Sequence, residues 1–189
     1  MRSNVQQGST VRSVPMVTSA PVGLQGYCPV CIVNMKKWVK GNATYQASYD
    51  GKTYHFPGEE QRQMFLSDPA KYAPALGGDC AVCLTDMGKR MPGSIFHSAL
   101  NENRLYLFPN ADLKQKFVGN VNQYNHADLA ENGNCVVCRV EMNKAMPGRP
   151  EVFLVHGGMR YQFASEDQKK MFLASPSKYA PTAAGSTSR

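Results

Sequence analysis

Six cysteines, arranged in three pairs, are the side chains of this chain best suited to chemistry. Each pair has the spacing Cys-x-x-Cys, and a methionine follows the second cysteine after four positions. The three sets are Cys28, Cys31 and Met35; Cys80, Cys83 and Met87; and Cys135, Cys138 and Met142. A second methionine recurs as Met91 and Met146, where the first set has Val39.

Thiolates and thioethers are soft donors that suit Cu(I). The spacing therefore predicts three soft-metal sites, with the cysteines as ligands and Met35, Met87 and Met142 as auxiliary ligands. The alternative is that each methionine fills the core beneath its cysteine turn.

Zinc is a weaker candidate for the same cysteines. A structural zinc site uses four ligands, usually cysteine and histidine, and each set offers two cysteines. The four histidines lie at unrelated distances from the first cysteine of their sets; they are His55, His97, His126 and His156. Copper is therefore the first candidate cofactor, and zinc fits less well.

The same pairs could instead be the disulfides Cys28–Cys31, Cys80–Cys83 and Cys135–Cys138. Six cysteines in three pairs, with none left over, are typical of an oxidising compartment. A further alternative is thiol–disulfide exchange, because a lysine recurs six positions after each pair and a nearby cation lowers the pKa of a thiol. These lysines are Lys37, Lys89 and Lys144, which could equally be solvated surface residues.

An internal repeat positions the three cysteine pairs. The distance from the first cysteine to a tyrosine near the end of each repeat is 44 residues in all three copies (72−28, 124−80, 179−135). Self-similarity at a fixed period indicates tandem units. Units of about 45 residues rarely fold on a hydrophobic core alone, so we expect a metal, a disulfide or a packed neighbour to support each. We assign residues 1–26 to a flexible arm, 27–74, 79–127 and 134–181 to the repeats, and 182–189 to a flexible tail.

Each repeat predicts the same order of elements, a cysteine turn, a β-hairpin and a short helix. Hairpin turns are indicated at 50–51, 101–103 and 157–158 by Asp-Gly, Asn-Glu-Asn and Gly-Gly. Ser165 is a good N-cap for a helix over 166–174, with Gln168 completing a capping box, and Asn110 can cap the corresponding helix of the second repeat. Pro69 and Pro176 are expected to end their helices. The fold class is therefore α+β, with three tandem modules.

The composition and charge of the chain limit the kinds of partner and the location that we expect for it. The formal net charge is +7 and the pI about 9.1, but the basic residues are scattered, so no nucleic-acid partner is expected. No apolar run approaches the ~20 residues of a membrane span. The first 26 residues lack the apolar centre of a secretory signal. The paired cysteines nevertheless favour a periplasmic, cell-envelope or extracellular location over the cytoplasm.

The first repeat resembles the YHS domain, a family related to the TRASH and treble-clef metal-binding domains. The resemblance lies in three segments, residues 28–31, 51–56 and 64–72. The resemblance includes Tyr54-His55-Phe56, and repeat three is similar through 158–163 and 172–179. Repeat two departs from the pattern at Val121, where a proline belongs. The resemblance implies a small metal-binding module. In metal-binding members two further cysteines complete a four-ligand site, but here those positions are Pro57 and Gln61, Pro109 and Leu113, and Ala164 and Gln168.

These observations together predict a non-enzymatic tandem YHS-like protein that binds a soft metal through its cysteine pairs. The alternative is an envelope or extracellular structural or assembly repeat with a disulfide in each unit; a thiol–disulfide redox module is the weaker alternative. Haem is excluded because no histidine follows a pair, and a nucleotide because no phosphate-binding glycine loop is present. The expected partner is a metal ion or another protein, including a second copy of this chain.

Overall fold

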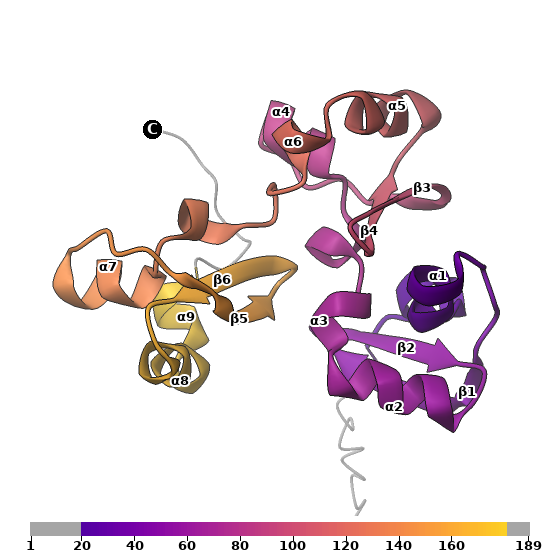
Figure 1. The fold of residues 1–189 in the computed structure, drawn as a ribbon, viewed down its shortest axis with the longest axis horizontal. Helices are drawn as coiled ribbons and strands as arrows, with labels where there is room; N and C mark the ends of the chain where they lie inside the picture. The colour runs from indigo at the N-terminus through magenta and orange to yellow at the C-terminus, as the bar shows by residue number, and fades with distance from the viewer. Residues whose placement is uncertain (1–19, 181–189) are drawn as a thin grey trace, which may run out of the picture.

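A computed structural model describes residues 20–180, which form three units in chain order (Figure 1). Each unit contains a first helix, a two-stranded antiparallel hairpin, a second helix and a short third helix. In repeat 1 these are α1 (Pro29–Met35), β1 (Asn42–Tyr49), β2 (Lys52–Phe56), α2 (Glu59–Ser67) and α3 (Pro69–Tyr72). In repeat 2 they are α4 (Ala81–Met87), β3 (Ser94–Asn101), β4 (Arg104–Phe108), α5 (Ala111–Gly119) and α6 (Val121–Tyr124). In repeat 3 they are α7 (Val136–Met142), β5 (Arg149–His156), β6 (Met159–Phe163), α8 (Glu166–Ala174) and α9 (Pro176–Tyr179). The predicted α+β class and the three modules are confirmed.

One detail of the predicted modules is wrong. The cysteine pairs do not form bare turns, because each begins a seven-residue helix. The expected helix ends before Pro69 and Pro176 are confirmed, since α2 ends at Ser67 and α8 at Ala174, and each proline also opens a further short helix. Proline suits the first position of a helix, where no intrahelical partner is needed for a backbone N–H.

The hairpin turns follow the sequence closely. Asp50 and Gly51 have φ values of 47° and 74°, and the matching turns at 102–103 and 157–158 also have positive φ. Two consecutive positive φ values fit a type I′ turn, whose twist matches that of the flanking strands. Gly41, thirteen residues after Cys28, lies against the returning strand: a Cβ there would be 2.4 Å from the carbonyl carbon of His55. Glycine therefore recurs at this point because the backbones approach too closely for a side chain.

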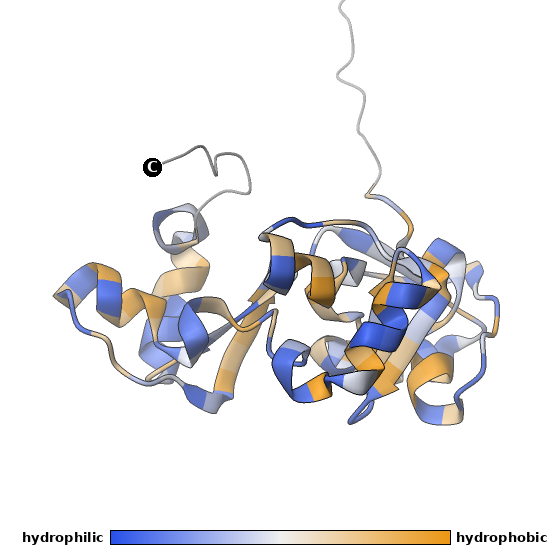
Figure 2. Ribbon diagram, turned by 90° about the horizontal axis from the view of Figure 1, so that it is seen from above, coloured by the Kyte–Doolittle hydropathy of each residue, from blue (hydrophilic) through white to orange (hydrophobic). Residues whose placement is uncertain are grey.

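One phenylalanine of the second helix is the centre of each core. Phe65 lies 5.1 Å, between ring centroids, from both Tyr54 and Phe56. Phe117 and Phe172 make the corresponding ring contacts in repeats 2 and 3. All three phenylalanines are buried. Blue and orange residues alternate along the helices in Figure 2, as expected for short elements with one buried face.

Repeats 1 and 2 share a hydrophobic core. Leu105 and Leu107 of β4 are 1% and 5% exposed and belong to the same buried cluster as Ile32 and Val33 of repeat 1. In repeat 3 the two positions equivalent to these leucines are arginine and glutamine. The contact between repeats 1 and 2 is therefore not reproduced between repeats 2 and 3.

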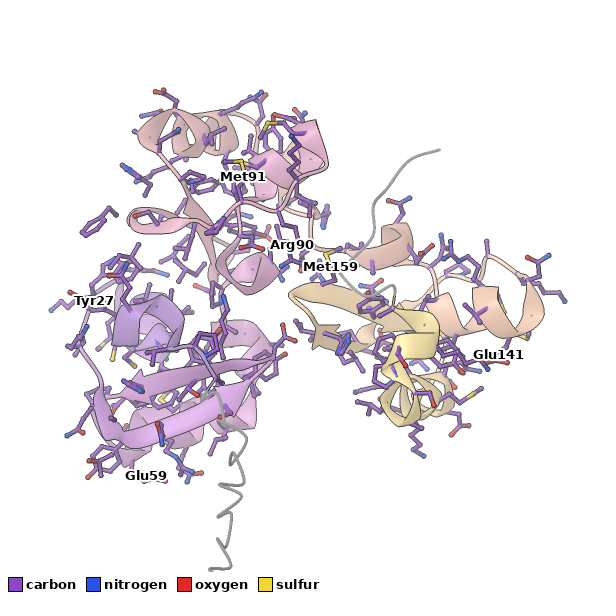
Figure 3. All side chains as sticks on the ribbon, turned by 180° about the vertical axis from the view of Figure 1, so that it is seen from behind. Tyr27, Glu59, Arg90, Met91, Glu141 and Met159 are labelled. Atoms are coloured by element: carbon purple, nitrogen blue, oxygen red, sulfur yellow. The ribbon has the colours of Figure 1, made fainter. Side chains whose placement is uncertain are left out.

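The tip of the β5–β6 hairpin connects repeat 3 to both other repeats. The backbone N–H groups of Gly157 and Gly158 donate to the Asp50 carboxylate at 2.7 and 2.6 Å. Arg90 donates to the carbonyl oxygens of Gly157 and Leu76, both at 2.6 Å. We call Asp50, Leu76 and Arg90 the hairpin socket. Figure 3 shows Arg90 beside Met159, next to the hairpin tip.

Connecting segments also take part in the fold. Short 3₁₀ turns precede the three repeats: η1 (Gly23–Gly26), η2 (Ala75–Gly78) and η3 (Ala130–Gly133). Residues 20–26 were assigned to a flexible arm, but Thr53 N–H donates to the Pro21 carbonyl at 3.0 Å and Leu24 is buried. Residues 1–19 and 181–189, which include the predicted tail, lie outside the described residues. Between residues 20 and 180, no helix has the length and apolar character needed to cross a membrane.

Candidate functional site

Each cysteine pair lies at the start of a helix in the same geometry. Cys28 is the N-cap of α1, and its Sγ accepts a hydrogen bond from the Cys31 N–H at 3.4 Å. The corresponding distances are 3.2 Å in repeat 2 and 3.4 Å in repeat 3. The first sulfur thus takes the place of the oxygen that usually caps a helix. Both cysteines of a pair therefore lie in or beside the first helical turn.

The loop after each first helix folds back to the first cysteine. The N–H of Cys28 donates to the carbonyl of Val39 at 2.9 Å. In repeats 2 and 3 the acceptor is a methionine carbonyl, Met91 or Met146, at 2.8 Å. This loop places the residue eleven positions after the first cysteine directly beside it.

The thiols of all three pairs are buried. All six cysteines are free thiols and at most 1% exposed. Burial raises the pKa of Cys28 and Cys83 to about 12 and that of Cys138 to about 11. The redox alternative would need a nearby lysine to lower the pKa of a thiol, but for these three thiols the pKa is raised, because desolvation of the charged form dominates.

The recurrent methionines lie at the ends of the first helices. Met35 and Met87 are 51% exposed and Met142 is 47% exposed. The alternative that they fill the core is therefore wrong. Met35 follows Cys31 by one helical turn, and residues four apart are neighbours on a helix surface. The Cβ atoms of the two residues are thus about 5–6 Å apart, while the methionine side chain is half exposed to solvent.

The donor set does not match a zinc site. Among residues 20–180 there is no group of three or more His, Cys, Asp or Glu side chains placed to hold one metal ion. The three cysteine pairs do not combine with one another or with the four histidines in such a group. Four-coordinate structural zinc therefore lacks ligands among the described residues, and each repeat presents two thiols at the start of one helix.

A buried ion pair at the junction of repeats 2 and 3 was not expected from the sequence. Asp128 is 1% exposed and accepts two hydrogen bonds from the Arg104 guanidinium. Burial alone would lower the pKa of Arg104, but Asp128 outweighs it and raises the pKa. The Arg160 N–H donates to the Asp128 carbonyl at 2.7 Å. These contacts hold the connector between repeats 2 and 3 in place, so we assign them a structural role.

Comparison with protein families gives one match. The model of the YHS domain matches residues 29–76, which run from α1 through the end of α3 into η2. The match falls on repeat 1, and repeats 2 and 3 have the same order of elements and the same cysteine geometry. Searches of curated proteins and of solved structures found no match.

Proposed function

We propose that the chain binds a soft metal ion, with Cu(I) as the first candidate, at each cysteine pair; the match of residues 29–76 to the model of the YHS domain supports this. The observation that carries the proposal is the repeated pair of sulfurs at a helix start, which no His, Asp or Glu side chain among the described residues extends to a group of three placed to hold one metal ion. Soft thiolates favour Cu(I) over ions that prefer oxygen ligands. The proposed role is binding and not catalysis.

The two sulfurs of each pair would hold the ion. A bound soft cation would supply the positive charge that keeps both sulfurs deprotonated, and the thiol protons would leave to solvent on binding. The helix N-terminus carries a partial positive charge that also favours thiolates. The surrounding aromatic core would exclude water from the pair. Met35, Met87 and Met142 are the auxiliary ligands in this proposal.

Silver(I), a soft cation that does not change oxidation state under these conditions, tests the proposal. We expect native mass spectrometry of the reduced chain to show up to three silver ions. Replacing one pair, for example by Cys28→Ser with Cys31→Ala, should lower the limit to two. Serine is a good helix N-cap, so the variant should keep its helix. A chain without any cysteine pair that binds as much silver as the parent would refute the proposal, provided circular dichroism shows equal folding.

A structural role without metal is the second candidate function, and burial of all six thiols in the cores supports it. In this alternative the pairs are core residues or disulfides of an envelope or extracellular protein. Intact mass measured without reductant separates the two candidates: a loss of six hydrogens with no bound metal would favour the disulfide form. A redox module fits less well, because thiol exchange needs an accessible thiolate and these thiols are buried.

A further inference from the structure

We propose that the three sites are unequal, because Met91 and Met146 provide a second thioether that repeat 1 lacks. Repeats 2 and 3 would then hold a soft cation more tightly than repeat 1. This inference rests on the proposed metal binding and goes beyond it by ranking the sites.

The first step is the position of the additional methionine. In repeat 2, the Cys80 N–H donates to the carbonyl of Met91 at 2.8 Å, and in repeat 3 Cys135 donates to Met146 at the same distance. The backbone of each methionine is therefore fixed beside the first cysteine of its pair. In repeat 1 the same hydrogen bond ends on Val39, which has no sulfur.

The second step is the methionine beside the other cysteine. Met87 lies one helical turn after Cys83, and residues at this spacing have Cβ atoms about 5–6 Å apart. In repeat 2 each cysteine thus has a methionine placed next to it by the backbone, Met91 for Cys80 through the hydrogen bond and Met87 for Cys83 through the helix. Repeat 3 has the same arrangement. Repeat 1 has three sulfurs, since Met35 stands beside Cys31 but Val39 stands beside Cys28.

The third step is that packing does not require methionine at these positions. Met87 and Met91 are 51% and 38% exposed, and Met142 and Met146 are 47% and 38% exposed. Val39 makes the same backbone bond and packs against the core of repeat 1, so the fold accepts a branched aliphatic residue there. A solvent-exposed thioether on a residue next to each cysteine is suited to meet a soft cation arriving from solvent.

The chain itself supplies reciprocal variants for a test. Each measurement uses the full chain with one cysteine pair kept and the other two replaced, so that a single site is observed. Silver(I) is the probe, and a competing chelator sets the free concentration. We expect Met91→Val to weaken silver binding of the repeat 2 site about tenfold, the lower end of the loss caused by removing a partner that supports a metal site. Val39→Met should strengthen the repeat 1 site by a similar factor.

A matched control separates this effect from a general loss of surface methionine. Met171 is 41% exposed and lies in α8, outside the loop that folds back to the cysteines. Met171→Leu should leave silver binding of the repeat 3 site unchanged. Equal affinities of the parent and the Met91→Val and Val39→Met variants would overturn the inference while leaving metal binding intact. If no single-pair chain binds silver, metal binding itself fails and the ranking fails with it. Circular dichroism of each variant confirms that binding is compared between folded chains.

Discussion

Replacing Asp50 by asparagine tests how firmly repeat 3 is held by the other two repeats. The Asp50 carboxylate accepts from the N–H groups of Gly157 and Gly158 at 2.7 and 2.6 Å, across 107 and 108 positions of sequence. The introduced asparagine would keep one acceptor oxygen and the left-handed backbone, since asparagine tolerates positive φ. The substitution therefore removes the charge and one of the two hydrogen bonds without disturbing the turn.

The expected loss of docking free energy follows from the type of hydrogen bond that is removed, one to a charged carboxylate. A hydrogen bond to a charged group contributes about 1.5–3 kcal/mol, and Asp50 is partly exposed, which places it toward the low end. We expect docking of the hairpin tip to weaken by about 1–2 kcal/mol, a factor of about 5 to 30 in equilibrium. Hydrogen exchange of the Gly157 and Gly158 amides, followed by NMR, should accelerate by this factor.

Glu102→Gln is the matched control, because Glu102 has the same position in the turn of repeat 2 and is exposed. It removes the same charge from a side chain that is exposed to solvent. Exchange at Gly157 and Gly158 should not change in this variant. Equal acceleration in both variants, or none in Asp50→Asn, would show that the carboxylate does not hold the hairpin tip.

Three further predictions concern the repeats themselves. Gly93→Ala should lower the free energy of unfolding by about 1–3 kcal/mol, because its Cβ would lie 2.4 Å from that of Leu107; Gly119→Ala, with nothing within 4 Å, should be neutral or stabilising in the same urea titration. Phe117→Ala should lower the free energy of unfolding by about 3–5 kcal/mol, because removing the ring leaves a cavity. A decrease below about 1 kcal/mol would contradict the assigned core. Burial raises the pKa of Cys28 from 9.0 to about 12, so the neutral thiol stabilises the fold fully below about pH 9 and this contribution is lost as the pH rises toward 12. Thermal unfolding between pH 8 and 11 should show a smaller decline for Cys28→Ser than for the parent; equal declines would mean that this thiol does not contribute.

Local features of the modules could be predicted from the sequence because they depend on neighbouring residues. The helix expected over 166–174 is α8, and Asn110 caps α5 through a 3.0 Å bond from Leu113 N–H. The capping box at Ser165 is formed in part: its hydroxyl accepts from Asp167 N–H, but the Gln168 side chain meets that hydroxyl and not the backbone. Each of these features lies within a few positions of the chain.

The helices at the cysteine pairs were not predicted, because cysteine is not among the preferred N-cap residues and a seven-residue helix is too short to show a clear period.

Contacts between distant segments were not predicted either. A signal did exist for the contact of repeats 1 and 2, since Leu105 and Leu107 replace the polar residues at the same positions of the other repeats. The burial of the thiols, which decides their pKa, likewise depends on packing that spacing alone does not specify.

The contacts of the hairpin socket restrict the gain or loss of whole repeats in this chain. In most tandem arrays each unit contacts only its neighbours, so units can be added or lost at an end. Here the last unit also docks on the first, through Asp50, and on the second, through Arg90. A fourth unit inserted between the second and third would move the hairpin tip away from its acceptors. The arrangement is therefore a closed set of three, and we expect whole-unit duplications or deletions to be tolerated less well than in open arrays.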